Sequence, residues 1–97
     1  MLDHETLKSV AEQMMSGLQV LVEGKSFRVS RTGTQRLRTV RFVMGGKEYQ
    51  AIEQNPEKPS RWGQLARAGK RVVQIRDLES QKYVAAVVDG KVTEYTR

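Results

Sequence analysis

Residues 36–53 read RLRTVRFVMGGKEYQAIE and place a β-hairpin near the middle of this 97-residue chain. Two runs rich in β-branched and aromatic residues flank the pair Gly45-Gly46. A Gly-Gly pair between two such runs indicates a two-residue hairpin turn, because both glycines can adopt positive φ. We therefore predict antiparallel strands over residues 36–44 and 47–53.

Working outward from this hairpin, the same strand chemistry recurs on both sides. Asp89-Gly90 is another strong hairpin turn, and it joins the last two predicted strands. Both alternating sets of residues in 83–88 are apolar, which predicts a strand that is covered on both faces and is therefore central. The further predicted strands cover residues 18–22, 26–31, 71–77, 83–88 and 92–95.

Two helices complete the predicted fold. Asp3 is a candidate N-cap for the first helix, whose apolar residues recur at helical spacing and which Gly17 would end in the left-handed conformation. Ser60 is a candidate N-cap for a short second helix that Gly69 would end. The predicted order is α-ββ-ββ-α-βββ. It describes an α+β fold with a mostly antiparallel sheet, or a small barrel, of about six to seven strands.

Length and composition set the class of protein. We expect one domain over residues 1–97, in which the helix at 1–17 either packs on the sheet or is a loosely attached arm. The chain has no cysteine, which excludes thiol catalysis, disulfides and thiolate metal sites and suits a reducing compartment. We therefore expect a cytoplasmic protein. No stretch approaches the roughly 20 apolar residues that a membrane span needs, and we expect no membrane partner.

The positive charge is concentrated in one quarter of the chain. The formal net charge is +6, and residues 24–47 alone hold seven bases and no acid. Alternation along extended strands would bring Arg28, Arg36 and Arg38 onto one cationic surface. Arginine suits phosphate recognition, because its planar guanidinium donates two hydrogen bonds to one phosphate. A second basic group surrounds the short helix. The candidate phosphate-binding residues are Arg28, Arg31, Arg36, Arg38, Arg41, Arg61, Arg67, Lys70 and Arg71.

Three interpretations of this charge stay open. A nucleic-acid-binding or regulatory module would place the arginines on the phosphates of DNA or RNA, with salt-dependent binding of low sequence selectivity. A protein–protein adaptor would bind an acidic protein, through the basic strands or by adding a partner strand at a sheet edge. In the third interpretation the charge belongs to a solvated sheet face and only prevents aggregation.

An enzyme has little support in the sequence. His4 is the only histidine, so without cysteine the chain lacks an ordinary set of zinc ligands. No serine has a recognisable base motif beside it. The glycines match neither a P-loop nor a dinucleotide-binding fingerprint. We expect no catalytic residue, no metal and no cofactor.

Overall fold

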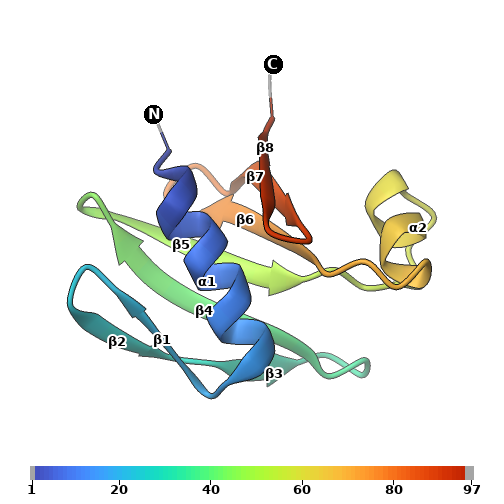
Figure 1. Ribbon diagram of the computed structural model, residues 1–97, viewed down its shortest axis with the longest axis horizontal. Helices are drawn as coiled ribbons and strands as arrows, with labels where there is room; N and C mark the ends of the chain where they lie inside the picture. The colour runs from blue at the N-terminus through green and yellow to red at the C-terminus, as the bar shows by residue number, and fades with distance from the viewer. Residues whose placement is uncertain (1, 96–97) are drawn as a thin grey trace.

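The computed structural model describes residues 2–95 and has two helices and eight antiparallel strands (Figure 1). The predicted α+β class and the predicted order of elements are confirmed, with one strand more than expected. In chain order the elements are α1 (His4–Ser16), β1 (Gln19–Val22), β2 (Lys25–Arg28), β3 (Ser30–Thr32), β4 (Leu37–Met44), β5 (Lys47–Glu53), α2 (Arg61–Arg67), β6 (Val72–Asp77), β7 (Lys82–Val88) and β8 (Lys91–Glu94).

The additional strand arises from a bend at Val29. β1 and β2 form a two-stranded hairpin, while β3 to β8 form a six-stranded sheet in sequence order. The predicted strand at 26–31 changes partner at Val29, because β2 pairs with β1 and β3 pairs with β4. The Val29 N–H still donates to the Leu18 carbonyl at 2.9 Å, so the chain leaves β1 only after that residue. One predicted strand thus becomes two.

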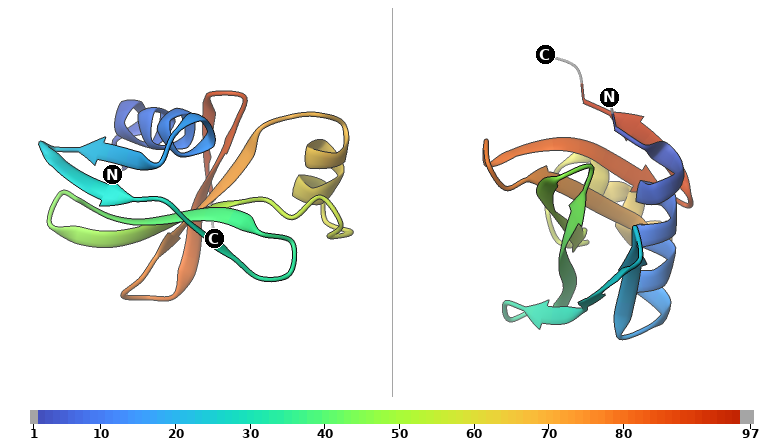
Figure 2. Two further views of the ribbon diagram at one scale, coloured as in Figure 1. Left: turned by 90° about the horizontal axis from the view of Figure 1, so that it is seen from below. Right: turned by 90° about the vertical axis from the view of Figure 1, so that its left-hand side faces the viewer.

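The strands do not close into a barrel, because α1 lies between the two ends of the curved array. The Gln13 side chain on α1 accepts from the Leu21 N–H of β1 at 2.9 Å and donates to the Leu21 carbonyl at 3.2 Å. At the other end of α1, His4 pairs with Glu94 of β8. Figure 2 shows α1 on one face of the sheet, with the β1–β2 hairpin on one side of it and β8 on the other.

The hydrophobic core lies between α1 and the face of the sheet that it covers. Leu7, Val10 and Met14 of α1 are fully buried and join Phe42 and the other apolar side chains of the core. The helix begins at the predicted cap, where the Asp3 carboxylate accepts from the Thr6 N–H at 3.2 Å. The first helix is therefore packed into the core and is not a loose arm.

The end of α1 differs from the prediction. The helix ends at Ser16, but Gly17 has a φ of −153° and is extended, not left-handed. The chain still turns back, because β1 runs along α1 in the opposite direction and Leu21 reaches Gln13, but it does so with Gly17 in the extended conformation (Figure 1). A glycine cap is favoured where the chain must take positive φ, and here it does not.

β7 is an interior strand, with β6 on one side and β8 on the other. Ala85, Ala86 and Val87 are buried, as the apolar pattern of 83–88 predicts. Tyr83 at the start of the strand is 46% exposed, so the predicted cover on both faces fails at this end. The sheet surface around Tyr83 is open to solvent.

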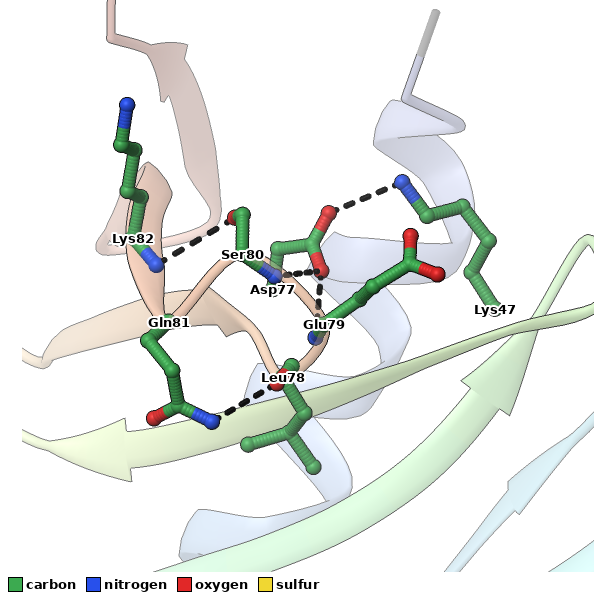
Figure 3. Close-up of polar contacts among 7 residues, drawn as sticks. All are labelled: Lys47, Asp77, Leu78, Glu79, Ser80, Gln81 and Lys82. Carbon is green, nitrogen blue, oxygen red and sulfur yellow. Dashed lines mark hydrogen bonds and ion pairs between the residues drawn. The ribbon is translucent and has the colours of Figure 1, made fainter.

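The turn between β6 and β7 is organised by a buried carboxylate (Figure 3). Asp77 accepts from Lys47 Nζ at 2.9 Å, from the Glu79 N–H at 2.8 Å and from the Ser80 N–H at 3.2 Å. The Lys47 ammonium and then the backbone N–H of Ser80 hold the pKa of Asp77 below its usual value. The same contact raises the pKa of Lys47. This ion pair fixes the start of β5 to the turn that leads into β7.

Candidate nucleic-acid interface

The face of the sheet opposite α1, here called the outer face, carries a continuous row of polar side chains. In β4 the inward residues Val40 and Phe42 are buried, and Arg41 between them points the other way. The strand register places Arg41 opposite Gln50, then Gln50 opposite Arg76, then Arg76 opposite Tyr83. Paired residues share a face. We call these four residues the outer row: Arg41, Gln50, Arg76 and Tyr83.

A second row runs beside the outer row and holds its side chains in place. The Gln50 amide donates to the Thr39 hydroxyl at 2.9 Å, and that hydroxyl donates to the Ala51 carbonyl at 3.1 Å. The Gln74 amide donates to Gln54 Oε1 at 2.7 Å. Neither row contains an acidic residue. The members of the second row are Ser30, Thr39, Ile52, Gln74, Ala86 and Thr93.

Three of the predicted arginines line one hollow at the β3 edge of the sheet. Arg28, Arg31 and Arg41 line an open hollow of about 410 Å³ together with hydroxyl and amide side chains. Arg31 lies on the edge strand β3 opposite the inward-facing Arg38, so the register places it on the inward face, and its Nη1 donates to the Arg36 carbonyl at 3.0 Å. The neutral residues that line the hollow are Ser30, Thr32, Thr39 and Gln50.

Arg36 and Arg38, which were predicted to join this basic surface, do not line the hollow. Arg36 is not part of β4 but ends the preceding turn with a φ of 56°, so strand alternation does not place it with Arg38. Arg38 shares the inward face of β4, where its Nη1 lies 3.5 Å from the Glu53 carboxylate and 3.9 Å from Met15 Sδ of α1. Its backbone N–H also donates to Glu53 at 2.8 Å. The prediction that Arg28, Arg36 and Arg38 form one surface is therefore wrong, because Arg38 faces α1.

The second basic group, around α2, is largely engaged within the protein. Arg67 donates through Nη1 to the Lys58 carbonyl at 2.9 Å and also to the Pro56 carbonyl, which holds the preceding loop against the helix. Lys70 Nζ lies 3.6 Å from the Asp89 carboxylate. These two side chains therefore stabilise the turn regions around α2.

Arg61 and Arg71 point to different surroundings. The Arg61 guanidinium lies 5.2 Å from the centre of the Trp62 ring, a cation–π geometry. Arg71 lines a groove beside α1, together with Lys8 and Glu12. The structure thus distributes the basic group around α2 over several surfaces and does not join it to the hollow of Arg28, Arg31 and Arg41.

Tyr83 and Arg76 belong to the outer face and were not among the predicted residues. Alternation in β6 could have placed Gln74 and Arg76 together, since Val73, Ile75 and Asp77 between and beside them are buried. Tyr83 could not be placed in this way. A register shift at Ile75/Arg76 decides that Tyr83, and not Val84, lies opposite Arg76.

Two further aromatic side chains lie at the α2 end of the sheet. The Trp62 and Tyr95 rings lie 6.0 Å apart. Tyr95 donates its hydroxyl to Gln74 Oε1, and burial, followed by the nearby Tyr83, raises the pKa of Tyr95 to about 12. Tyr95 is therefore fixed within the structure, in contrast to Tyr83.

Comparison of the chain with protein-family models, with curated proteins and with solved structures gave no match. Within residues 2–95 no cluster of three or more histidine, aspartate or glutamate side chains could hold a metal ion. No helix in the same part of the chain is long and apolar enough to cross a membrane.

Proposed function

We propose that this protein binds nucleic acid and that the outer face of its sheet contacts the phosphates. The observation that carries the proposal is the pair Arg41 and Arg76, which stand on either side of Gln50 in two rows that contain no acid. Residues 2–95 contain four ion pairs, and none of them includes Arg28, Arg31, Arg41 or Arg76. Arg31 Nη1 is engaged with the Arg36 carbonyl and Arg76 Nε is buried, so Arg28, Arg41 and the terminal nitrogens of Arg76 are the groups that remain for an anion.

A solvated surface without a partner would be expected to mix charges of both signs. Here one acid, the exposed Glu48, lies on the outer face next to Gln50 but outside the two rows, and several others lie on the α1 side of the molecule. Asp3, Glu5 and Glu12 belong to α1 and its cap, and Glu94 lies beside His4 at the start of that helix. A polyanion would be attracted to the outer face and repelled by the α1 side, which orients its approach.

The chemistry of the outer face suits a phosphate backbone. Arginine forks donate two hydrogen bonds to one phosphate, and the second N–H of the Gln50 amide, whose first is bonded to Thr39, adds a neutral donor. Contacts of this kind give affinity with little sequence selectivity, and the affinity falls as salt rises. The expected setting is the cytoplasm.

The test is fluorescence anisotropy of labelled DNA and RNA oligomers, titrated with the protein at low and physiological salt. Arg41→Gln removes one charge from the outer face, and the matched control Lys8→Gln removes one charge from the exposed side of α1. We expect Arg41→Gln to weaken binding severalfold and to reduce the slope of log K against log salt by about 1. Lys8→Gln should leave both unchanged. Absence of binding at low salt, or equal losses in the two variants, would contradict the proposal.

A second candidate function is a protein–protein adaptor, which the separation of charge between α1 and the outer face favours. The acidic α1 of one copy complements the cationic outer face of another. Strand addition at β1 has less support, since the Gln13 side chain already occupies the N–H and carbonyl of Leu21. Light scattering at low and high salt tests the adaptor. A dimer that dissociates in high salt supports it, and a monomer under all conditions contradicts it.

A further inference from the structure

Tyr83 is the one exposed aromatic side chain among residues 2–95, and it ends the outer row. The other aromatic residues are buried or half-buried, including Phe42 and Tyr49, whose rings stack 5.8 Å apart in the core. Tyr83 lies directly opposite the half-buried Arg76, so the aromatic and the cationic residue belong to the same part of the outer face. That combination provides stacking and phosphate contact side by side.

The surface next to Tyr83 is shaped and polar enough to receive a planar heterocycle. A hollow of about 150 Å³ adjoins Tyr83, with Leu37 and Ile52 as its apolar lining. The side chains of Gln54, Asn55 and Gln74 also line it, together with Glu53 and Lys58. Gln74 is engaged with Gln54 and Tyr95, and the Gln54 amide donates to the Asn55 carbonyl, so the Asn55 side-chain N–H groups are the donors left for an acceptor on the edge of a nucleobase.

From these features we infer that the outer face takes a single-stranded nucleic acid. One base stacks on Tyr83 over the hollow, and the neighbouring phosphates lie on Arg76 and Arg41. The inference rests on the proposed function, and it adds that an unpaired base is part of what is recognised. Bases within a duplex are stacked on one another and do not offer a free face to a tyrosine, whereas bases of a single strand do.

The dimensions of the fold also favour a single strand over a duplex. The outer row spans three strand intervals of about 4.8 Å, or about 14 Å, while the major groove of DNA is about 12 Å wide. A broad sheet face of this kind cannot enter the groove. α2 has only seven residues, and its Arg67 is engaged with the Lys58 carbonyl, so it offers no reading helix.

The experiment compares three probes of equal length: a single strand, the duplex of the same sequence, and an abasic strand that has phosphates but no bases. Anisotropy titrations with the unaltered protein should show the single strand bound more tightly than either of the others. Tyr83→Ala should weaken single-strand binding by about 5- to 150-fold, the range for loss of one base–aromatic stack. It should not change the salt slope, because it removes no charge. Tyr83→Phe keeps the ring and should bind within about twofold of the unaltered protein.

The outcomes separate this inference from the proposed function. Equal affinity for all three probes, or single-strand binding that Tyr83→Ala leaves unchanged, would overturn the stacking role and leave the phosphate-binding face in place. Failure of every probe to bind at low salt would overturn both. Because the probe comparison uses the unaltered protein, it decides the question even if Tyr83→Ala fails to fold, which circular dichroism would reveal.

Discussion

Truncation of Leu7 to alanine tests how firmly α1 belongs to the core. The Leu7 side chain has 0% exposure and packs between the helix and the sheet. Removing it forfeits the transfer free energy of the lost methyl groups and leaves a cavity, and together these cost about 2.7–5 kcal/mol at buried leucines. In a domain of this size each kcal/mol lowers the melting temperature by about 4–8 °C. We therefore expect Leu7→Ala to lower the melting temperature by an amount on the order of 10–40 °C.

The assays are thermal and urea denaturation, both monitored by circular dichroism, with Leu18→Ala as the matched control. Leu18 is 80% exposed, so the same chemical change there should alter the free energy of unfolding by no more than about 0.5 kcal/mol. The sign of the stability change in Leu7→Ala also distinguishes a packed helix from a loose arm. In an exposed helix, alanine is a slightly better helix former than leucine, so a loose arm would tolerate Leu7→Ala or gain from it. If Leu7→Ala costs no more than Leu18→Ala, the packing described for α1 is incorrect.

Three further outcomes are expected. Gly63→Ala should lower the free energy of unfolding by about 1–3 kcal/mol in urea titrations, because the added Cβ would lie 2.0 Å from the Lys58 carbonyl oxygen and force the loop before α2 to move. Asp77→Asn should reduce the loss of stability in acid. The pKa of Asp77 is lowered in the folded protein, so its contribution is present above the ordinary carboxyl pKa of 3.8 and is lost as pH falls through the lowered value. Unfolding measured by circular dichroism from pH 7 to pH 2 checks this. Arg38→Gln should leave oligonucleotide affinity in anisotropy titrations unchanged, in contrast to Arg41→Gln, because Arg38 faces α1.

The chain offers controls for these variants. Gly17→Ala adds a Cβ that would lie 3.5 Å from the Gln13 carbonyl oxygen, an ordinary contact in extended backbone, so it should cost little. An equal cost at Gly17 and Gly63 would contradict the steric explanation. Identical pH profiles for Asp77→Asn and the unaltered protein would remove Asp77 from the acid-sensitive groups. An affinity loss in Arg38→Gln equal to that of Arg41→Gln would place the binding surface elsewhere.

The parts of the fold that depend on local chemistry could be predicted from the sequence. Gly45 and Gly46 both take positive φ between β4 and β5, and Asp89 and Gly90 do so between β7 and β8. Turns of this kind are determined by a few adjacent residues. The division of β2 from β3 at Val29 and the insertion of α1 between β1 and β8 depend on packing between distant segments, which no local pattern records.

The candidate site was harder to predict from local sequence patterns than the fold was. Arg41 could be placed from alternation within its own strand. The partner of Arg76 could not, because the register shift beside it decides that Tyr83 completes the row. Arg36 was assigned to a strand on its composition, yet it takes positive φ in the turn before β4. Strand register and turn conformation therefore determine which arginines lie together. The distribution of charge along the sequence does not predict it.

The spacing within the outer row explains why its arginines need no acidic partner in the protein. Like charges directly opposite one another on adjacent strands destabilise a sheet. Arg31 and Arg38 are in that position, and Arg38 is paired with Glu53. Arg41 and Arg76 are instead separated by the neutral Gln50, two strand intervals or about 10 Å apart, where water screens their repulsion. The sheet therefore tolerates both charges unpaired, which keeps both guanidinium groups available to the phosphates of a bound strand.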